Sequence, residues 1–147
     1  MNLEKLLQEY LTNSELMQLA TVSKGQPWLC NVYFVADENN NIYWTSTRAR
    51  RHSKEIIKYT RVAATIVHDS KNKQALQITG DAFEVPLPDM ERVYNLYGKK
   101  FGMKASRLAE ALENKPDGRA FYILKPTSIS FWDEVNFPDN PKQVLGI

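Results

Sequence analysis

The chain has little of the chemistry on which metal sites and disulfides depend. Cys30 is the only cysteine among 147 residues, so no intrachain disulfide can form and nothing indicates an oxidising compartment. Its apolar neighbours predict a small buried side chain, with no adjacent base to make it a nucleophile. His52 and His68 do not form a metal-ligand spacing with each other or with this cysteine. We therefore predict no metal site.

Glycine and long apolar runs are also scarce. With six glycines, the sequence has no Gly-rich dinucleotide loop, no P-loop and no Gly-x-Ser-x-Gly nucleophile motif. No apolar run approaches the roughly 18 residues of a membrane span, and the first residues lack a signal-like apolar core. We therefore expect a cytoplasmic protein without a membrane partner. The formal net charge of +2 argues against broad, unspecific binding of nucleic acid.

What the chain does have is a succession of short strand patterns between polar turns. Its length and composition fit one domain over residues 1–147. Apolar residues at helical spacing predict an N-terminal helix within 1–13 and a helical insertion at 86–115, with helices at 89–96 and 105–112. Strands are predicted at 16–22, 28–36, 42–47, 62–68, 74–85, 120–124 and 128–134. Their hairpin connections predict a mainly β fold, an antiparallel barrel of six or seven strands with peripheral helices.

Positive charge is concentrated between the third predicted strand and the helix that follows it. Residues 48–61 contain one acid, Glu55, and six cations: Arg48, Arg50, Arg51, Lys54, Lys58 and Arg61. The strand before them ends in the hydroxyls of Thr45 and Ser46. Backbone N–H groups at a helix start attract an anion, and Arg and Lys complete its shell, so this combination predicts a phosphate site. The alternative is an ordinary solvated helix face.

Short motifs follow one another through residues 15–135, at 19–22, 27–32, 42–46, 51–56, 76–82, 121–126 and 129–133. Each is short, and their order and spacing carry the information. Together they resemble the pyridoxamine 5′-phosphate oxidase-like family of FMN-binding split barrels, and a small bacterial branch of it most of all. The resemblance implies a split barrel of the FMN-binding type that forms a homodimer, with FMN in a groove between the subunits.

The resemblance also implies which residues hold the cofactor. The flavin phosphate would meet hydroxyls at the strand end and basic residues at the helix start. Backbone groups of the second strand would run beside the flavin ring, a glutamine would face it, and a late tryptophan would close the pocket from the partner subunit. The implied cofactor-binding residues are Asn31, Val32, Thr45, Ser46, Arg51, His52, Lys54, Gln77 and Trp132.

Two features depart from the family pattern. His52 stands where a lysine is frequent, and a neutral imidazole holds phosphate less firmly. The tail lacks the Arg- and His-bearing segment with which the true oxidase holds pyridoxal phosphate, so we do not expect a pyridoxamine phosphate oxidase. From the residues alone, Trp132 fits a core or interface position better than a contact with the ring, and Gln77 could face solvent, although a cofactor-side position is slightly favoured.

The leading functional interpretation is a flavin-dependent oxidoreductase acting on an unknown small molecule. NADH or NADPH is the candidate electron donor, and no catalytic side chain is assigned because the flavin performs the redox chemistry. One alternative is a non-enzymatic carrier or sensor of flavin, deazaflavin or haem. The other is a nucleic-acid-binding module that uses residues 48–61 with Tyr43 and Trp44 for stacking, although we expect no nucleic-acid partner.

Overall fold

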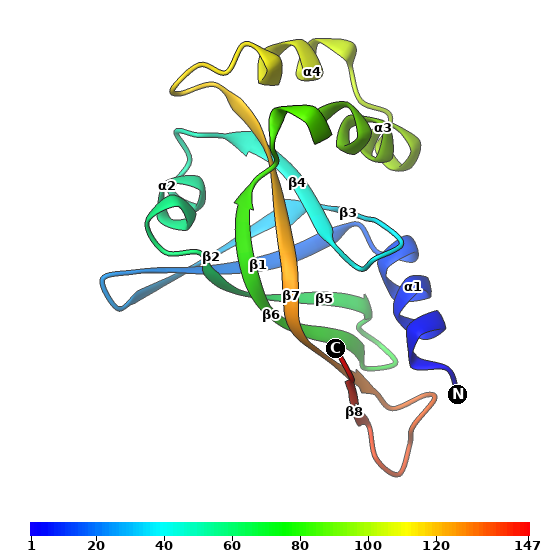
Figure 1. Ribbon diagram of the computed structural model, residues 1–147. Coiled ribbons are helices and arrows are strands. Elements are labelled where there is room, and N and C mark those ends of the chain that lie inside the picture. Colours follow the sequence, from blue (N-terminus) through cyan, green and yellow to red (C-terminus); the bar gives the residue numbers. More distant parts are fainter.

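The computed structural model describes all 147 residues (Figure 1). Its helices are α1 (Leu3–Asn13), α2 (Arg51–Lys58), the 3-10 helix η1 (Leu87–Asp89), α3 (Met90–Phe101) and α4 (Ala105–Leu112). Its strands are β1 (Leu16–Ser23), β2 (Gln26–Tyr33), β3 (Val35–Ala36), β4 (Ile42–Thr47), β5 (Arg61–Asp69), β6 (Gln74–Glu84), β7 (Arg119–Asp133) and β8 (Lys142–Leu145).

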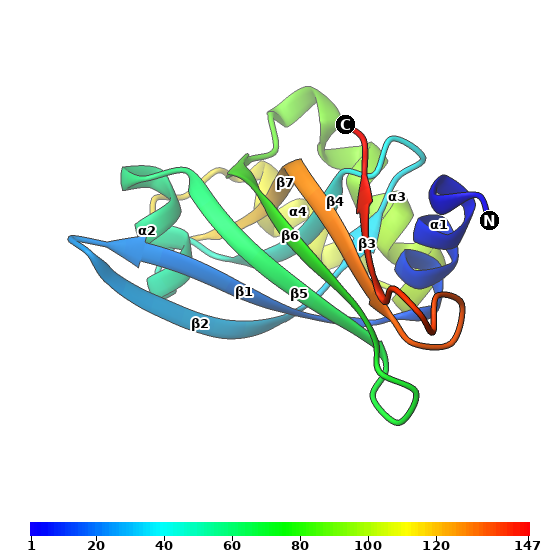
Figure 2. The same cartoon turned by 90° about the horizontal axis from the view of Figure 1, so that it is seen from below.

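All eight strands belong to one antiparallel sheet that curls into a half-open barrel (Figures 1 and 2). The strand order is β2-β1-β5-β6-β7-β4-β3, and β8 pairs with β7 beside this path. Helix α1 lies near β3, α2 packs against β1 and β6, and α3 and α4 cover the far ends of β4 and β7. This architecture confirms the predicted antiparallel split barrel with peripheral helices.

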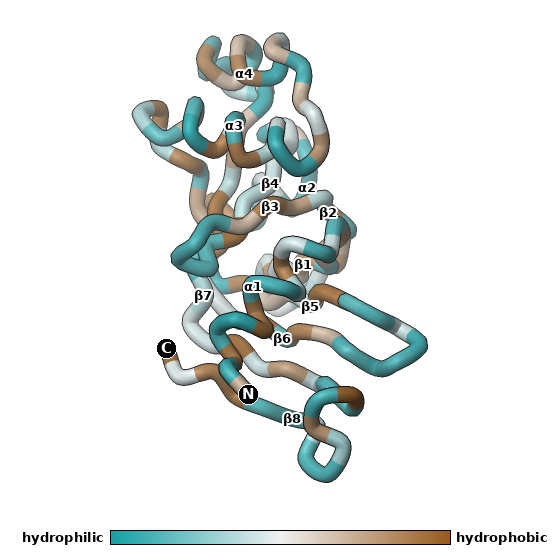
Figure 3. Tube along the Cα trace, turned by 90° about the vertical axis from the view of Figure 1, so that its right-hand side faces the viewer, coloured by the Kyte–Doolittle hydropathy of each residue, from teal (hydrophilic) through white to brown (hydrophobic).

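Two separate groups of apolar side chains hold the fold together. The larger fills the barrel, where the inward-facing residues of alternating strands, such as Leu19 and Ile78, meet Leu7 and Tyr10 of α1. The smaller lies on the other face of β4 and β7, beneath α3 and α4. Hydrophobic and hydrophilic segments alternate along both of these helices in Figure 3, as is typical of amphipathic helices. Residues of β4 therefore alternate between the two cores.

The predicted strand at 28–36 is two strands. Pairing of β2 with β1 ends at Tyr33, and β3 pairs with β4 instead. Between them Phe34 is fully buried in the barrel core, and its N–H donates to the Glu15 carbonyl at 3.0 Å. A continuous apolar pattern does not reveal this change of partner, because both strands and the residue between them favour β structure.

The two strands predicted at 120–124 and 128–134 are one long strand, β7. Pro126 does not end it, because the register shifts opposite Gly80 and leaves an extra residue in β7 at this point. The backbones are very close here, since a Cβ on Gly80 would lie 2.4 Å from the Lys125 carbonyl oxygen. Gly80 therefore marks both a bulge and a close approach of the two backbones.

Two further boundaries differ from the sequence prediction. Helix α3 continues to Phe101 through the segment around Gly98 that was expected to join two helices. The Pro-containing tail adds β8, so the sheet has eight strands rather than six or seven. No helix of the protein combines the length and apolar character needed to cross a membrane.

Candidate functional site at the corner between β4 and α2

The N-terminus of α2 is open. Arg50 occupies the N-cap position without a side-chain cap, and the first turn contains no acidic residue. No oxygen of the chain accepts a hydrogen bond from the backbone N–H groups of Arg51, His52 or Ser53. Three unsatisfied donors at the positive end of a helix dipole form an anion-binding arrangement.

The cations of the 48–61 run divide into structural and unpaired groups. Arg48 makes a bidentate pair with Glu84, at 2.8 and 3.1 Å, and also donates to the Lys115 carbonyl and the Asn114 side chain. It is therefore fully used in joining the β4–α2 loop to β6 and to the segment before β7. Three cations of the run have no ion pair or side-chain hydrogen bond: Arg50, Lys54 and Lys58.

The Arg51 side chain lies along α2 and uses one of its donor nitrogens within the chain. Its Nε donates to Glu55 at 2.9 Å, and its guanidinium lies 4.1 Å from the centre of the Trp28 ring. Thr21 also donates to Glu55, and this hydrogen bond, followed by Arg51, lowers the pKa of the carboxyl. The two terminal nitrogens of Arg51 have no partner in the chain. They remain available to an anion in front of the helix.

His52 and Ser53 are buried beneath the first turn, next to Trp44 and Tyr122. His52 Nε2 and Trp44 Nε1 have no partner, and Ser53 Oγ and Tyr122 OH have none except each other. Burial, and then the charge of Arg50, lower the pKa of His52, so its imidazole is neutral at pH 7. Buried polar groups without partners are rare, and their concentration here indicates a water or ligand group that completes the site.

Thr45 and Ser46 lie on opposite faces of β4, as successive residues of a strand must. Ser46 shares the face of Trp44 and α2. Thr45 lies on the face of the smaller core, where it donates to the Ala120 carbonyl and accepts from Arg119 at 3.3 Å. Only one of the two predicted hydroxyls therefore faces the α2 side. Arg119 is a cation that sequence reasoning missed, and it is also paired with Glu110 at 3.2 Å.

The remaining predicted residues lie on the sheet. Asn31 and Gln77 point outward, in a row of side chains that crosses the strands through Gln18, Thr65 and Ser130. Gln18 donates to Asn31 at 3.0 Å and accepts from Thr65 at 3.1 Å. Small side chains around this row leave a shallow hollow of about 520 Å³.

Two other predicted residues, Val32 and Trp132, lie outside this row. The Val32 side chain is buried in the barrel core, so only its backbone is available, on a strand whose other edge is unpaired. Trp132 is exposed on the outer face, roughly 40 Å along β7 from the strand end that borders Ser46. One chain therefore brings together Ser46, Arg51 and His52, and leaves Trp132 far away.

The curled antiparallel sheet with peripheral helices is a split-barrel fold. The model of the pyridoxamine 5′-phosphate oxidase family matches residues 3–133. The chain belongs to this family.

Solved structures with the same fold carry different descriptions. General Stress Protein 26 from Bacillus anthracis is 14% identical, with a TM-score of 0.67 over 89% of this chain and 94% of that one. HutZ, a heme storage protein from Vibrio cholerae, is 20% identical, with a TM-score of 0.68 over 88% and 94%. An F420 reductase is 25% identical, with a TM-score of 0.62 over 84% and 94%. Among curated protein sequences, none matches the chain.

Proposed function

We propose that the protein binds FMN and acts as a flavin-dependent oxidoreductase on a small molecule. The observation that supports this most is the open N-terminus of α2, with three free backbone donors and the unpaired Arg50 beside them. A phosphate dianion matches this set, because it offers several acceptor oxygens and two negative charges. The proposal includes a cytoplasmic location, as expected in the sequence analysis.

The residues at the corner differ in what they can offer to the phosphate group of FMN. Ser46 and the terminal nitrogens of Arg51 supply donors on the α2 side, and His52 is neutral and offers at most one donor. Lys54 is exposed one turn further on and contributes charge. Thr45 would act through Arg119 rather than directly, since its hydroxyl lies on the other face.

FMN itself would supply the hydride or electron transfer, with NADH or NADPH as the proposed donor. The part left to the chain is binding and orientation. The unpaired edge of β2 near Asn31 and Val32 offers backbone N–H and C=O groups to the ring, and Gln77 offers an amide from the sheet face. No side chain is assigned to a proton transfer.

A homodimer is part of the same proposal. The outer sheet face carries exposed apolar side chains at its margins, among them Leu29, Tyr33 and Trp132, around the polar row. Surfaces of this kind are usually covered by a partner. Because Trp132 lies too far along β7 to meet the corner of its own chain, its proposed contact with the flavin requires the second subunit.

The absorption spectrum of the purified protein tests the binding proposal. We expect the visible absorption of a bound flavin in the isolated protein or after addition of FMN, and quenching of FMN fluorescence at about micromolar protein. A colourless protein that leaves FMN fluorescence unchanged would remove the proposal. Mass spectrometry of the material released on denaturation identifies the ligand in the first case.

A non-enzymatic carrier or sensor is the second candidate, because solved structures with this fold include a heme storage protein and a heme binding protein. The two candidates differ in turnover. An oxidoreductase should be bleached by NADH or NADPH under anaerobic conditions and reoxidised by its acceptor. Bound FMN that neither nucleotide reduces favours the carrier, and release of haem or deazaflavin identifies a different cargo.

A further inference from the structure

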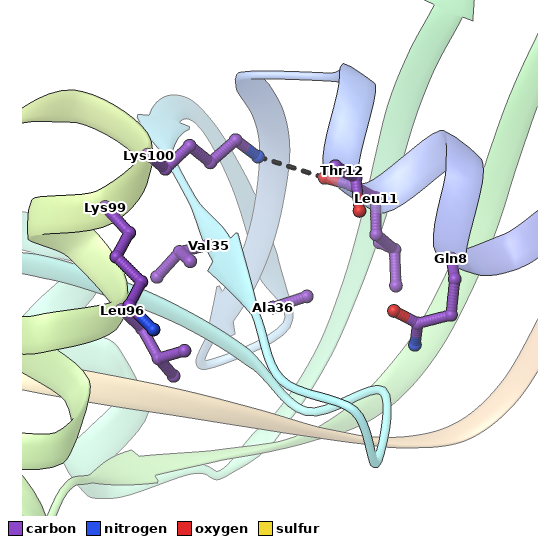
Figure 4. Close-up of a pocket in the computed structure, with 8 residues that line it drawn as sticks. All are labelled: Gln8, Leu11, Thr12, Val35, Ala36, Leu96, Lys99 and Lys100. Carbon is purple, nitrogen blue, oxygen red and sulfur yellow. Dashed lines mark hydrogen bonds between the residues drawn. The ribbon is translucent and has the colours of Figure 1, made fainter.

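A second hollow, of about 380 Å³, lies between α1, β3 and α3, away from the β4–α2 corner (Figures 1 and 4). Val35 and Ala36 of β3 form its floor. Leu11 of α1 and Leu96 of α3 line the two sides. This size and this apolar lining are within the range of small-molecule sites.

The charged groups of the hollow all have the same sign. Lys99 and Lys100 line it, and no carboxylate does. Figure 4 shows the Lys99 side chain on the α3 side, with its ammonium group next to Leu96. No ion pair or hydrogen bond of the chain involves Lys99 Nζ. An unpaired cation at the edge of an apolar cavity favours an anionic ligand with an apolar body.

Lys100 has a different role in the same hollow. Its Nζ donates to the Leu11 carbonyl at 3.0 Å and to the Ser14 carbonyl, and it lies 4.2 Å from the centre of the Phe34 ring. Burial lowers the pKa of Lys100 to about 8, so it remains mostly charged at neutral pH. Lys100 therefore holds the end of α1 in place and adds to the positive potential, while Lys99 is free to bind.

Two polar atoms on the α1 side have no partner. Gln8 donates through Nε2 to the Asn40 side chain at 2.6 Å, which fixes the amide and leaves Oε1 free. The Thr12 hydroxyl also makes no hydrogen bond within the chain. These groups could accept from a hydroxyl or amine of a ligand, but they would not hold a second carboxylate as strongly as a lysine does.

We propose that this hollow binds a small amphipathic monocarboxylate. The carboxylate pairs with Lys99, and the apolar body packs on Leu11, Ala36 and Leu96. The inference does not depend on FMN, because the hollow shares no residue with the corner between β4 and α2.

Hexanoate and hexanamide are matched probes, since they differ in the charge and not in the apolar body. We expect hexanoate to bind in the millimolar range or tighter and hexanamide about tenfold more weakly, as one charge-assisted contact would give. Titration followed by ¹H–¹⁵N spectra should move the amide signals of Val35, Leu96 and Lys99. The same titration in the presence of FMN should give the same result.

Substitutions test the contributions of the Lys99 charge and of the hollow's shape to binding separately. Lys99→Met should weaken hexanoate about tenfold and leave hexanamide unchanged. The control is Lys104→Met, which removes an exposed lysine that does not line the hollow. Thr12→Trp should block both probes from an exposed position on α1, without disturbing the core.

Three results with the unaltered protein would overturn the proposal. They are no binding of hexanoate up to about 20 mM, equal affinity for the amide, and hexanoate-dependent shifts confined to the β4–α2 corner. Equal loss of hexanoate binding in the Lys99 and Lys104 variants would also overturn it, because general charge would then explain the effect.

Discussion

The ends of helices α1 and α2 differ in whether their backbone groups have partners in the chain. At the N-terminus of α1, Asn2 Oδ1 accepts from the Lys5 N–H at 3.2 Å, and at its C-terminus Lys100 donates to two carbonyls. At the N-terminus of α2, Arg50 provides no cap, and three N–H groups have no acceptor. The chain supplies a side-chain cap at the N-terminus of α1 and none at the N-terminus of α2.

This difference separates polar groups that have partners in the chain from groups that have none. A capped helix end contributes to stability, and an uncapped end surrounded by cations is suited to the anion binding that we propose for it. The same division runs through the basic segment, where Arg48 is a structural residue and Arg50 has no partner. The substitutions below test whether stability and binding separate along this line.

The largest effect on stability is expected from Arg48→Met, which removes the hydrogen bonds of the structural arginine. It should lower the free energy of unfolding by about 2–3 kcal/mol, because Glu84 and two further acceptors lose a charged donor. Chemical denaturation measures it. The matched control, Arg50→Met, should stay within about 0.5 kcal/mol of the parent. Similar losses of unfolding free energy in both variants would show that Arg48 does not contribute more to stability than Arg50.

Arg51→Ala tests the binding side. It should weaken FMN by about 2 kcal/mol, or roughly thirtyfold, because one charge-assisted contact with the phosphate is lost. Riboflavin, which has no phosphate, should be affected much less. Fluorescence titration with both ligands gives the comparison. If the two affinities fall equally, Arg51 acts on the ring or on the fold through Glu55 and Trp28, and not on the phosphate.

Arg50→Asp closes the open end of α2. An aspartate at the N-cap accepts from the free N–H groups and complements the dipole, so the free energy of unfolding should rise by about 1 kcal/mol. FMN binding should fall, because the carboxylate would occupy the place of the phosphate and repel it. Asn2→Ala at the closed end of α1 is the opposite case, with a loss of about 1 kcal/mol and unchanged FMN affinity. Stronger FMN binding by Arg50→Asp would contradict the proposed phosphate position.

The last comparison concerns pH and Lys100. Burial lowers its pKa in the folded protein to about 8, so between this value and 10.5 the unfolded chain binds more protons than the folded one. The contribution of Lys100 to the free energy of unfolding should therefore rise with pH through this window. Denaturation at about pH 7.5 and about pH 9.5 should show the rise in the parent and a flatter profile in Lys100→Met. A profile that is identical in both proteins would assign the dependence to other groups.

The sequence predicts the antiparallel barrel because its alternating strands and polar turns are local signals. It also predicts the basic corner, since Ser46, Arg50 and Arg51 are neighbours in the chain. It does not predict the partners of Arg48, because Glu84 and Asn114 lie far away in the sequence. Nothing local indicates that this arginine, among six cations, is used for structure.

Long-range pairing also explains the other misses. Arg119 is next to Thr45 because β4 and β7 pair, and a pattern of single residues carries no register information. Lys100 closes α1 from a helix that begins much later in the chain. The change of partner at Phe34 depends on β4 offering an edge, which is a property of the assembled sheet. The roles predicted for the nine cofactor residues stay predictions.

The close approach at Gly80 restricts how this architecture can vary in related or engineered chains. With a backbone oxygen 2.4 Å from where its Cβ would be, any larger residue forces β6 and β7 apart. Inserting or deleting one residue in β6 would place a different residue at this crossing and reverse the faces of the strand beyond it. The close approach of β6 and β7 at this bulge thus depends on a residue that has no Cβ.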